Sequence, residues 1–304
     1  MIKLEAADLA ARLKEEVKAE IERGVRASLA AVRVGDDPAS AVYVRNKIRA
    51  CEEVGIRSEH HALPESTTTE QLLELISSLN TRDDVDGILT QLPLPAHVDE
   101  TAIIEAMNPL KDVDGFHPVN AGRLQSGQPG LQPCTPAGII EVLKRAKLPI
   151  AGQNAVVVGR SDIVGKPAAL LLLNESATVT VCHSKTHDLA AVTRGADIIV
   201  AAIGRPGFIA AEMVKPGAVL IDVGINRLTD KADVERFFAG DEKRAETFAK
   251  RGSVIVGDID PAAFKLASAY TPVPGGVGAL TIAMLMHNTV KAAKLRRGIT
   301  VEGE

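Results

Sequence analysis

Hydrophobic and polar positions alternate with two different periods in the first third of the chain. Apolar residues that recur every three or four positions predict helices at 5–23, 38–54, 67–80 and 99–108. Shorter apolar runs between these helices predict strands at 29–35, 57–63 and 86–94. Strands that alternate with helices are typical of a parallel sheet covered on both faces, where ligands bind at the carboxyl ends of the strands. This part of the chain therefore predicts an α/β domain.

The alternation starts again after a loop-rich passage at 109–136, which we expect to connect two domains. Further strands are predicted at 154–159, 177–184, 196–204, 217–225 and 253–259. A charged stretch at 228–252 predicts an exposed helical excursion, and 279–298 predicts a long amphipathic helix that ends in basic residues and Gly298. The predicted fold class is α/β, with two α/β domains that flank a cleft, the second a Rossmann-like parallel sheet.

One lysine of the helix at 38–54 lies on the wrong side of it. At about 100° per residue, Lys47 falls one turn after Tyr43, inside the apolar arc of Val44 and Val54 and away from the charged face. Such a lysine can simply bury its stem and keep its ammonium in water. Alternatively, it lines a cleft with a pKa lowered by partial desolvation, and Tyr43 stacks on a planar ligand. The helix alone leaves both interpretations open.

Composition narrows the class of protein. The chain has 304 residues, of which 46% are apolar and 24% charged, and a net charge of −4 argues against nucleic acid as the main partner. Its three cysteines are widely spaced without a CxxC pair, so neither a disulfide framework nor a zinc site is predicted. The start carries acidic residues, and no apolar run approaches the length of a membrane span. We expect a cytoplasmic protein with no membrane partner.

The segment VVVGRSDIVGKP predicts a strand, a glycine turn and a helix that can hold a pyrophosphate. Ser161 stands where the dinucleotide fingerprint has its second glycine, so a plain turn after Gly159 remains an alternative. The next strand ends in CHSK, without the acidic residue that binds an NAD ribose. Arg160, Ser184 and neighbouring basic groups suit a 2′-phosphate, which favours NADP, unless these groups merely face solvent.

Several glycine- and proline-rich segments combine with these patterns. Each of GILTQLPLP, KDVDGFHP, DVGIN and TPVPGGVG alone is compatible with an ordinary turn. Together with VGDDPASAVYVRNK, PCTPAG, VVVGRSDIVGKP and TVTVCHSKT, they resemble the bifunctional methylenetetrahydrofolate dehydrogenase/methenyltetrahydrofolate cyclohydrolase family. The resemblance covers nearly the whole chain, with the segments in the family's order.

The resemblance implies a folate-binding catalytic domain formed by residues 1–119 plus 273–304 and an NADP-binding domain formed by residues 120–272. It implies a homodimer with tetrahydrofolate-type substrates bound in the interdomain cleft. The implied chemistry is NADP-dependent oxidation of methylene-tetrahydrofolate, followed by hydrolysis to 10-formyl-tetrahydrofolate, within one-carbon metabolism. Hydride transfer and hydrolysis of this kind need positioning and proton transfer, and no metal is expected.

The resemblance also implies roles for individual residues. Catalytic roles fall on Lys47, Tyr43, Gln91 and Asp114, with Lys47 serving the hydrolysis, Gln91 tuning it, Tyr43 against the folate ring and Asp114 on the pterin. The expected substrate site comprises these four residues and Thr90, Leu92, Pro274, Gly275, Gly276, Val277 and Gly278. The expected cofactor site comprises Gly159, Arg160, Ser161, Ser184 and Ile225.

Three features depart from the family's usual pattern. Ala279 and Leu280 replace the Pro-Met that usually follows PGGVG, Thr90 replaces an aliphatic residue, and the excursion at 228–252 is long. Two other functions are kept as alternatives. One is a different two-domain NADP oxidoreductase, such as a shikimate-dehydrogenase-like enzyme, which would not require QLPLP and PGGVG together. The other is a non-catalytic homologue that binds folate or nucleotide, against which the presence of Lys47, Gln91 and Asp114 argues.

Overall fold

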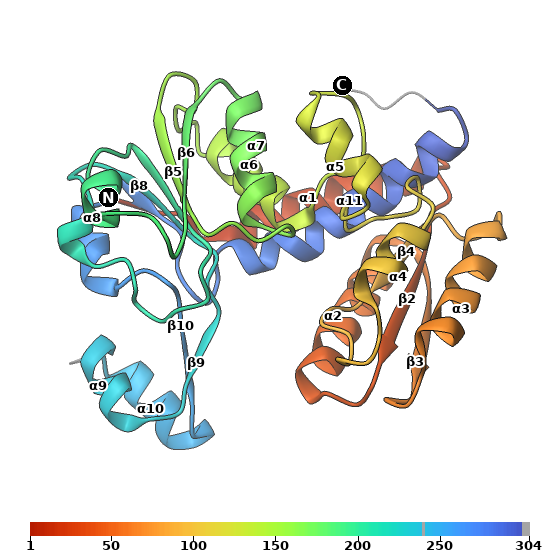
Figure 1. The fold of residues 1–304 in the computed structure, drawn as a ribbon, viewed down its shortest axis with the longest axis horizontal. Helices are drawn as coiled ribbons and strands as arrows, with labels where there is room; N and C mark the ends of the chain where they lie inside the picture. Colours follow the sequence, from red (N-terminus) through yellow and green to blue (C-terminus); the bar gives the residue numbers. More distant parts are fainter. Residues whose placement is uncertain (239–240, 300–304) are drawn as a thin grey trace. The chain divides into compact units, whose positions relative to one another are not determined.

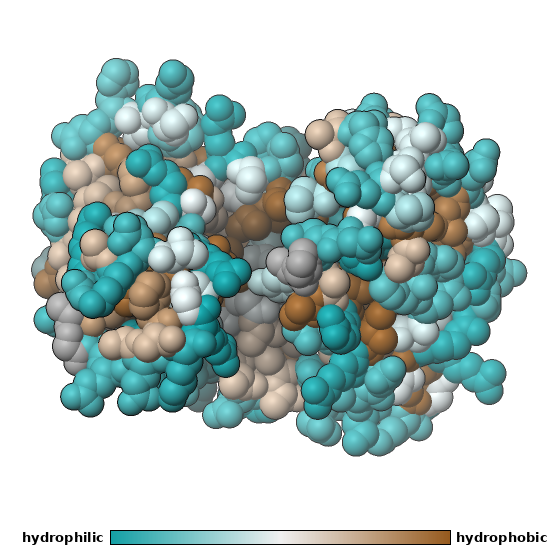
Figure 2. Space-filling model, turned by 90° about the horizontal axis from the view of Figure 1, so that it is seen from below, coloured by the Kyte–Doolittle hydropathy of each residue, from teal (hydrophilic) through white to brown (hydrophobic). Residues whose placement is uncertain are grey.

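The computed structural model describes residues 1–238 and 241–299, with only the backbone described for residues 38–39. The chain forms an α/β fold with parallel sheets, as the alternating pattern predicts. No helix in the described ranges is both long and apolar enough to cross a membrane. On the face drawn in Figure 2, hydrophilic residues cover most of the surface and apolar residues form scattered groups.

Contacts divide the chain into two compact units. Unit 1 comprises residues 1–9 and 135–280, and unit 2 comprises residues 10–134 and the described residues from 281 onward. These bounds differ from the predicted domains at three places. Residues 1–9 and 273–280 lie in unit 1 instead of the first domain, and residues 120–134 lie in unit 2.

Unit 2 contains a three-stranded parallel sheet in the order β3-β2-β4. Its strands are β2 (Ser28–Val34), β3 (Arg57–Leu63) and β4 (Gly87–Thr90). Four helices lie entirely in unit 2: α2 (Pro38–Val54), α3 (Thr69–Thr81), α4 (Glu100–Ala106) and α5 (Pro118–Gln125). Every residue of β2 and β4 is buried, because helices cover both faces of the sheet, whereas the edge strand β3 is partly exposed. Figure 1 shows α2, α3 and α4 around the sheet.

The start of α2 is fixed by its own sequence. The Asp37 carboxylate accepts a hydrogen bond from the Ser40 N–H at 2.7 Å, and Pro38 occupies the first turn. At the other end, Gly55 adopts φ 82°, the left-handed conformation that glycine tolerates best. These two signals confirm the predicted helix and set the position of Lys47 along it.

Unit 1 contains a six-stranded parallel sheet in the order β1-β11-β8-β7-β5-β6. Its strands are β1 (Ile2–Lys3), β5 (Asn154–Val158), β6 (Thr178–Cys182), β7 (Ile198–Ala201), β8 (Val219–Asp222) and β11 (Ala269–Tyr270). Besides the helices of the charged excursion, its described helical segments include α6 (Cys134–Arg145, of which Cys134 belongs to unit 2), α7 (Gly165–Asn174), α8 (Leu189–Thr193), η1 (Ala211–Met213) and η2 (Pro261–Leu266). The Rossmann-like parallel sheet predicted for the second domain is therefore confirmed.

Two long helices each contribute residues to both units. α1 (Ala6–Glu22) begins in unit 1 and continues in unit 2, and α11 (Val277–Arg296) does the same. Within unit 2, Arg296 at the end of α11 and Arg297 directly after it bind the buried Asp86 carboxylate, with N–O distances of 2.6 and 2.9 Å. These ion pairs fasten the carboxyl end of α11 to the segment that leads into β4.

The charged excursion is helical, as predicted, in its described residues. It contains β9 (Asn226–Leu228), α9 (Lys231–Phe238) and α10 (Glu242–Arg251), and residues 239–240 lie outside the described part. The strand predicted at 253–259 is shorter, β10 (Val254–Val256), and pairs antiparallel with β9. The prediction that it continues the parallel alternation was wrong, because its apolar residues pack under α9 against Val234 and Phe237. Figure 1 shows these elements away from the six-stranded sheet.

The passage predicted as loop at 109–136 contains α5 and the start of α6. The beginning of α5 lacked an obvious signal because its cap is the imidazole of His117, whose Nδ1 accepts a hydrogen bond from the Val119 N–H at 3.0 Å. The short strands β1 and β11 were also not predicted. Each has only two residues, so neither offers a measurable alternation of apolar and polar positions.

Candidate active site

Lys47 and Gln91 form the centre of the candidate site in unit 2. Lys47 is 9% exposed and its Nζ donates a hydrogen bond to Gln91 Oε1 at 3.0 Å. The Gln91 amide is oriented by a second bond, from its Nε2 to the Leu92 carbonyl oxygen at 2.7 Å. Because that bond uses the amide nitrogen, the amide oxygen faces the lysine. Tyr43, one turn earlier on α2, is 44% exposed and its ring is accessible to a ligand.

Asp114 lies close enough to Lys47 for the charges of the two side chains to interact. Burial raises the pKa of its carboxyl to about 6, the nearby Lys47 ammonium lowers it, and the Asp112 carboxylate raises it. Asp114 lines a small cavity together with Thr90, Leu92 and Phe116. The structure thus brings the predicted residues of unit 2 into one neighbourhood, with Thr90 buried and its hydroxyl without a hydrogen-bond partner among the described residues.

The loop that carries Asp114 is built around the buried Asp112. Its carboxylate accepts hydrogen bonds from the backbone N–H groups of Gly115 and His117, at 3.1 and 2.8 Å, and from the Asn120 amide at 2.9 Å. Gly115 has φ 73°, and a Cβ there would lie 2.5 Å from the Gln132 carbonyl carbon. Only glycine fits at this position, and the turn it forms sets the path of the backbone that carries Asp114.

Two more side chains that the sequence did not single out hold the same loop. Lys111 is 1% exposed and its Nζ donates to the carbonyls of Leu79, Asn80 and Arg82, which closes the end of α3. Burial lowers the pKa of Lys111 to about 8. From α11, the Asn288 amide donates to the Val113 carbonyl at 2.8 Å. Asp112 could have been noticed as the first acid of KDVD, but nothing near Asn288 in the sequence marks its role.

In unit 1, the glycine turn after β5 is confirmed as a close backbone approach. Gly159 has φ 126°, and a Cβ there would lie 2.1 Å from the Ala202 carbonyl oxygen. A Cβ on Gly165 would lie 2.3 Å from the Gly159 carbonyl oxygen. Ser161 Oγ accepts from the Val164 and Gly165 N–H groups, both at 3.3 Å, and so shapes the first turn of α7. The absence of side chains at these glycines lets a pyrophosphate approach the helix start.

The side chains around this turn fit a phosphorylated dinucleotide. Arg160, Ser161, Ser184 and Lys185 are all exposed, so their cationic and hydroxyl groups can reach a ligand. β6 ends at Cys182 and is followed by a turn in which the Lys185 N–H donates to His183 Nδ1. No acidic residue lies at that strand end to repel a 2′-phosphate. The described residues contain no group of three or more acidic, histidine or cysteine side chains with metal-binding geometry.

Ile225 and the 274–278 loop lie side by side in unit 1. The Ile225 Cδ1 atom is 3.8 Å from the position that a Cβ would take on Gly278, and Ile225 is 55% exposed. Gly275 has φ 103°, and a Cβ on Gly276 would lie 2.4 Å from the Pro272 carbonyl oxygen. After Val277 the chain enters α11, in which Leu280 is buried against Gly138.

Two buried carboxylates that the sequence analysis did not assign shape the loops around Ile225. Asp258 accepts hydrogen bonds from the backbone N–H groups of residues 203–205, at 2.6 to 2.9 Å, and from the Asn226 amide at 2.8 Å. Asp222 accepts from the N–H groups of Gly224, Asp258 and Ile259, at 2.8 to 2.9 Å. Burial raises the pKa of Asp222 to about 7. Ile225 lies between Gly224, which donates to Asp222, and Asn226, which donates to Asp258.

The six-stranded parallel sheet and its glycine turn place the protein in the class of two-domain α/β proteins with an NAD(P)-binding domain. The chain belongs to the tetrahydrofolate dehydrogenase/cyclohydrolase family. Residues 4–114 match the model of the family's catalytic domain, and residues 133–297 match the model of its NAD(P)-binding domain.

Relatives agree over almost the full length. The chain is 60% identical over 302 residues to a bifunctional protein FolD from Koribacter versatilis, with 98% of each chain covered. A crystal structure of the bifunctional FolD enzyme from Campylobacter jejuni is 45% identical, with a TM-score of 0.88 over 97% of this chain and 99% of that one. A Trypanosoma brucei FolD structure, complexed with NADP cofactor and an inhibitor, is 35% identical, with a TM-score of 0.87 over 98% of both chains. The family excludes the shikimate-dehydrogenase-like alternative.

Proposed function

We propose that this chain catalyses both reactions of its family: NADP-dependent oxidation of 5,10-methylenetetrahydrofolate to 5,10-methenyltetrahydrofolate, and hydrolysis of that product to 10-formyltetrahydrofolate. One observation carries the proposal beyond family membership. Lys47 is buried, is hydrogen-bonded to an oriented glutamine and lies near a carboxyl whose pKa is raised, which is an arrangement for proton transfer and not for solvation of a surface lysine.

For the oxidation, the chain has to bind and align its two substrates. NADP⁺ supplies the hydride acceptor when bound. We infer that the Gly159 turn and the start of α7 hold its pyrophosphate, that Arg160 and Ser184 hold its 2′-phosphate, and that Ile225 packs at the nicotinamide end. We assign the folate ring to Tyr43, by stacking, and to Asp114, by hydrogen bonds from the N–H groups of the pterin. The folate nitrogens themselves stabilise the cationic product, so alignment is the main contribution of the protein.

The hydrolysis needs protons to be moved at defined places. Water adds to the methenyl carbon and loses one proton, which leaves a hydroxyl on that carbon. The bond from the carbon to one ring nitrogen then breaks as the nitrogen takes a proton and the hydroxyl loses its own, which forms the formyl group and releases one proton overall. We propose that Lys47 Nζ handles these transfers, that Gln91 keeps it in position, and that Thr90 and Leu92 form the neighbouring wall. The unpartnered Thr90 hydroxyl is available to a substrate group or a water molecule.

A parallel spectrophotometric assay tests the function. With methylene-tetrahydrofolate and NADP⁺, the purified chain should form NADPH and should convert methenyl-tetrahydrofolate in the same reaction. If neither signal changes while ligand still binds, the chain is a non-catalytic homologue. NADPH formation without methenyl-tetrahydrofolate decay would restrict the proposal to the dehydrogenase.

Arg160→Ala should weaken the binding of NADP⁺ about 10- to 100-fold and leave the binding of NAD⁺ nearly unchanged, because a charge-assisted hydrogen bond to a phosphate is lost. The measurement is KM for each cofactor in the dehydrogenase reaction. Lys144→Ala is a matched control, since Lys144 is an exposed cation on α6 that pairs with Glu175. Equal losses for both cofactors would refute the assignment of the 2′-phosphate to Arg160.

Asp114→Asn should lower kcat/KM while it stabilises the protein at neutral pH. The pKa of Asp114 is about 6, above its ordinary value of 3.8, so ionisation costs more in the folded than in the unfolded chain and stability falls as pH rises from about 4 to 6. Above pH 6, the amide should therefore raise the free energy of unfolding by on the order of 2 kcal/mol.

The activity of the wild type should show the opposite trend. Its kcat/KM should rise as pH increases to about 6, because the carboxylate form accepts the pterin hydrogen bonds, and this rise should be missing in the Asp114→Asn variant. Denaturant titrations at pH 4, 6 and 8 and a pH–rate profile measure both effects. A variant with an unchanged profile would show that Asp114 does not bind the substrate in its ionised form.

We further infer a cytoplasmic homodimer that supplies one-carbon units, including those for purine biosynthesis. The supporting observations are the family membership and the exposed edge strand β1, whose Ile2 is 54% exposed.

A further inference from the structure

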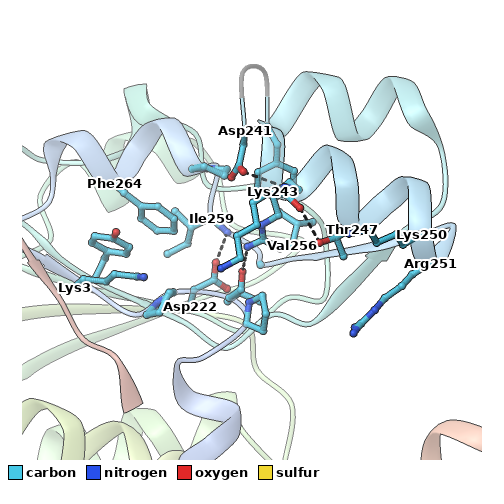
Figure 3. A pocket seen from close by; sticks show the side chains of 18 residues that line it. Lys3, Asp222, Asp241, Lys243, Thr247, Lys250, Arg251, Val256, Ile259 and Phe264 are labelled. Carbon is cyan, nitrogen blue, oxygen red and sulfur yellow. Dashed lines mark hydrogen bonds between the residues drawn. The ribbon is translucent and has the colours of Figure 1, made fainter. Parts of the chain in front are cut away.

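A large cavity in unit 1 is lined by none of the candidate cofactor residues. Its volume is about 700 Å³, within the range of small-molecule sites. In Figure 3, Lys3 and Phe264 lie on one side and the side chains of α10 on the other, with Asp222 between them. Of the described residues that line the cavity, Pro274 alone belongs to the substrate and cofactor sets proposed above. The cavity is therefore not explained by the proposed function.

The lining of this cavity is strongly basic. Five of its side chains are cationic: Lys3, Lys243, Arg244, Lys250 and Arg251. Its two acidic residues already have partners, since Asp222 accepts three backbone N–H groups and Asp241 caps α10. Lys243 and Arg251 are exposed, and neither side chain forms an ion pair or hydrogen bond with any residue in the described ranges. The cavity thus offers two uncommitted cations to an anionic ligand.

Aromatic rings form another part of the wall. The rings of Phe264 and Tyr270 stack with their centroids 4.3 Å apart and their planes 16° from parallel. The Arg244 guanidinium lies 4.6 Å from the centre of the Phe238 ring, and its N–H groups donate to the carbonyls of Ile255 and Val273 at 2.7 Å. These contacts hold the wall in place. Such a wall suits a planar, ring-bearing ligand, because aromatic rings stack on heteroaromatic bases.

We propose that this cavity is a second ligand site, distinct from the cofactor site, that binds a nucleoside polyphosphate. Lys243 and Arg251 bind its phosphates, and the wall of Phe264 and Tyr270 receives its base. The ligand class follows from the combination of charge and rings: phosphates alone would not need the aromatic wall, and an apolar ligand would leave the cations unpaired.

The test is calorimetric titration of ADP into the full chain saturated with NADP⁺, so that the cofactor site is already filled. One ADP should bind per chain. The double variant K243Q/R251Q removes both charges from exposed positions and should weaken ADP binding at least tenfold. The matched control is K231Q, which alters an exposed lysine of α9 that does not line the cavity, and it should keep the wild-type affinity within twofold.

Three results would overturn the proposal. The first is no ADP binding to the NADP⁺-saturated protein. The second is an equal loss of ADP affinity in K231Q and in K243Q/R251Q, which would indicate general charge attraction. The third is pyrophosphate binding as tightly as ADP, which would exclude a contact between the base and the aromatic wall. Thermal unfolding of each variant establishes that the compared proteins are folded.

Discussion

Lys47→Met should lower the rate of methenyl-tetrahydrofolate hydrolysis about 10²- to 10⁴-fold, the usual contribution of one general acid–base group. Methionine keeps most of the buried stem but cannot donate or accept the proton, and it leaves Gln91 Oε1 without its partner. The dehydrogenase reaction, in which the residue serves positioning, should fall less. The measurement is the decay of methenyl-tetrahydrofolate absorbance under single-turnover and steady-state conditions.

Arg49→Met is the matched control for this substitution. Arg49 lies on the exposed side of α2, where it pairs with Glu53 at 3.2 Å, so its loss removes a cation from the same helix without touching the site. We expect both activities of that variant to stay within twofold of the wild type. Wild-type hydrolysis by Lys47→Met would assign the proton transfers to another group, and Asp114 would then be the first to examine.

Asp258→Ala should destabilise unit 1 by about 1.5–3 kcal/mol, because four donors lose the buried carboxylate that accepts their hydrogen bonds. The loop at 203–205 and Asn226 should then loosen, and NADP⁺ affinity should fall with them. Chemical denaturation followed by circular dichroism gives the first effect, and cofactor titration at a temperature where the variant is folded gives the second.

Asp260→Ala provides the comparison two residues away. The Asp260 carboxylate caps η2 by accepting the Ala262 N–H at 2.8 Å, and loss of an ordinary cap costs about 1 kcal/mol. If Asp258→Ala were no more destabilising than Asp260→Ala, then the N–H groups around Asp258 would find other acceptors and its central role in these loops would be refuted.

The sequence alone was sufficient to predict most helices and strands and the position of Lys47 on its helix. The helix at 38–54 carries its own start and stop signals in Asp37, Pro38 and Gly55, so the positions of its residues around the helix axis could be predicted. The strands of the six-stranded sheet that have four or more residues were all predicted. Burial on both faces gives β5, β7 and β8 continuous apolar runs, whereas the largely exposed edge strand β6 alternates polar and apolar residues. Two-residue strands and a helix capped by histidine carry no comparable signal.

The supports of the site were harder to predict. Asp112, Lys111 and Asn288 act through backbone groups far along the chain, and such groups leave no pattern in the sequence. Asp222 belongs to the segment DVGIN, yet its partners at 258 and 259 follow β10, in a stretch that the alternation had assigned to a parallel strand. Residues that contact ligands can be inferred from a motif, whereas those that position loops depend on which segments meet in space.

The division of the chain into four alternating stretches constrains how the protein can be recombined. Because the unit boundaries fall after residues 9, 134 and 280, neither unit corresponds to one continuous piece of the gene. A chimera that takes one unit from a relative therefore needs three crossovers, two of them inside α1 and α11. A single crossover would divide at least one unit, so that one part of it came from this protein and the other part from the relative. New cofactor and folate specificities are therefore more readily combined by substitution of residues than by exchange of segments.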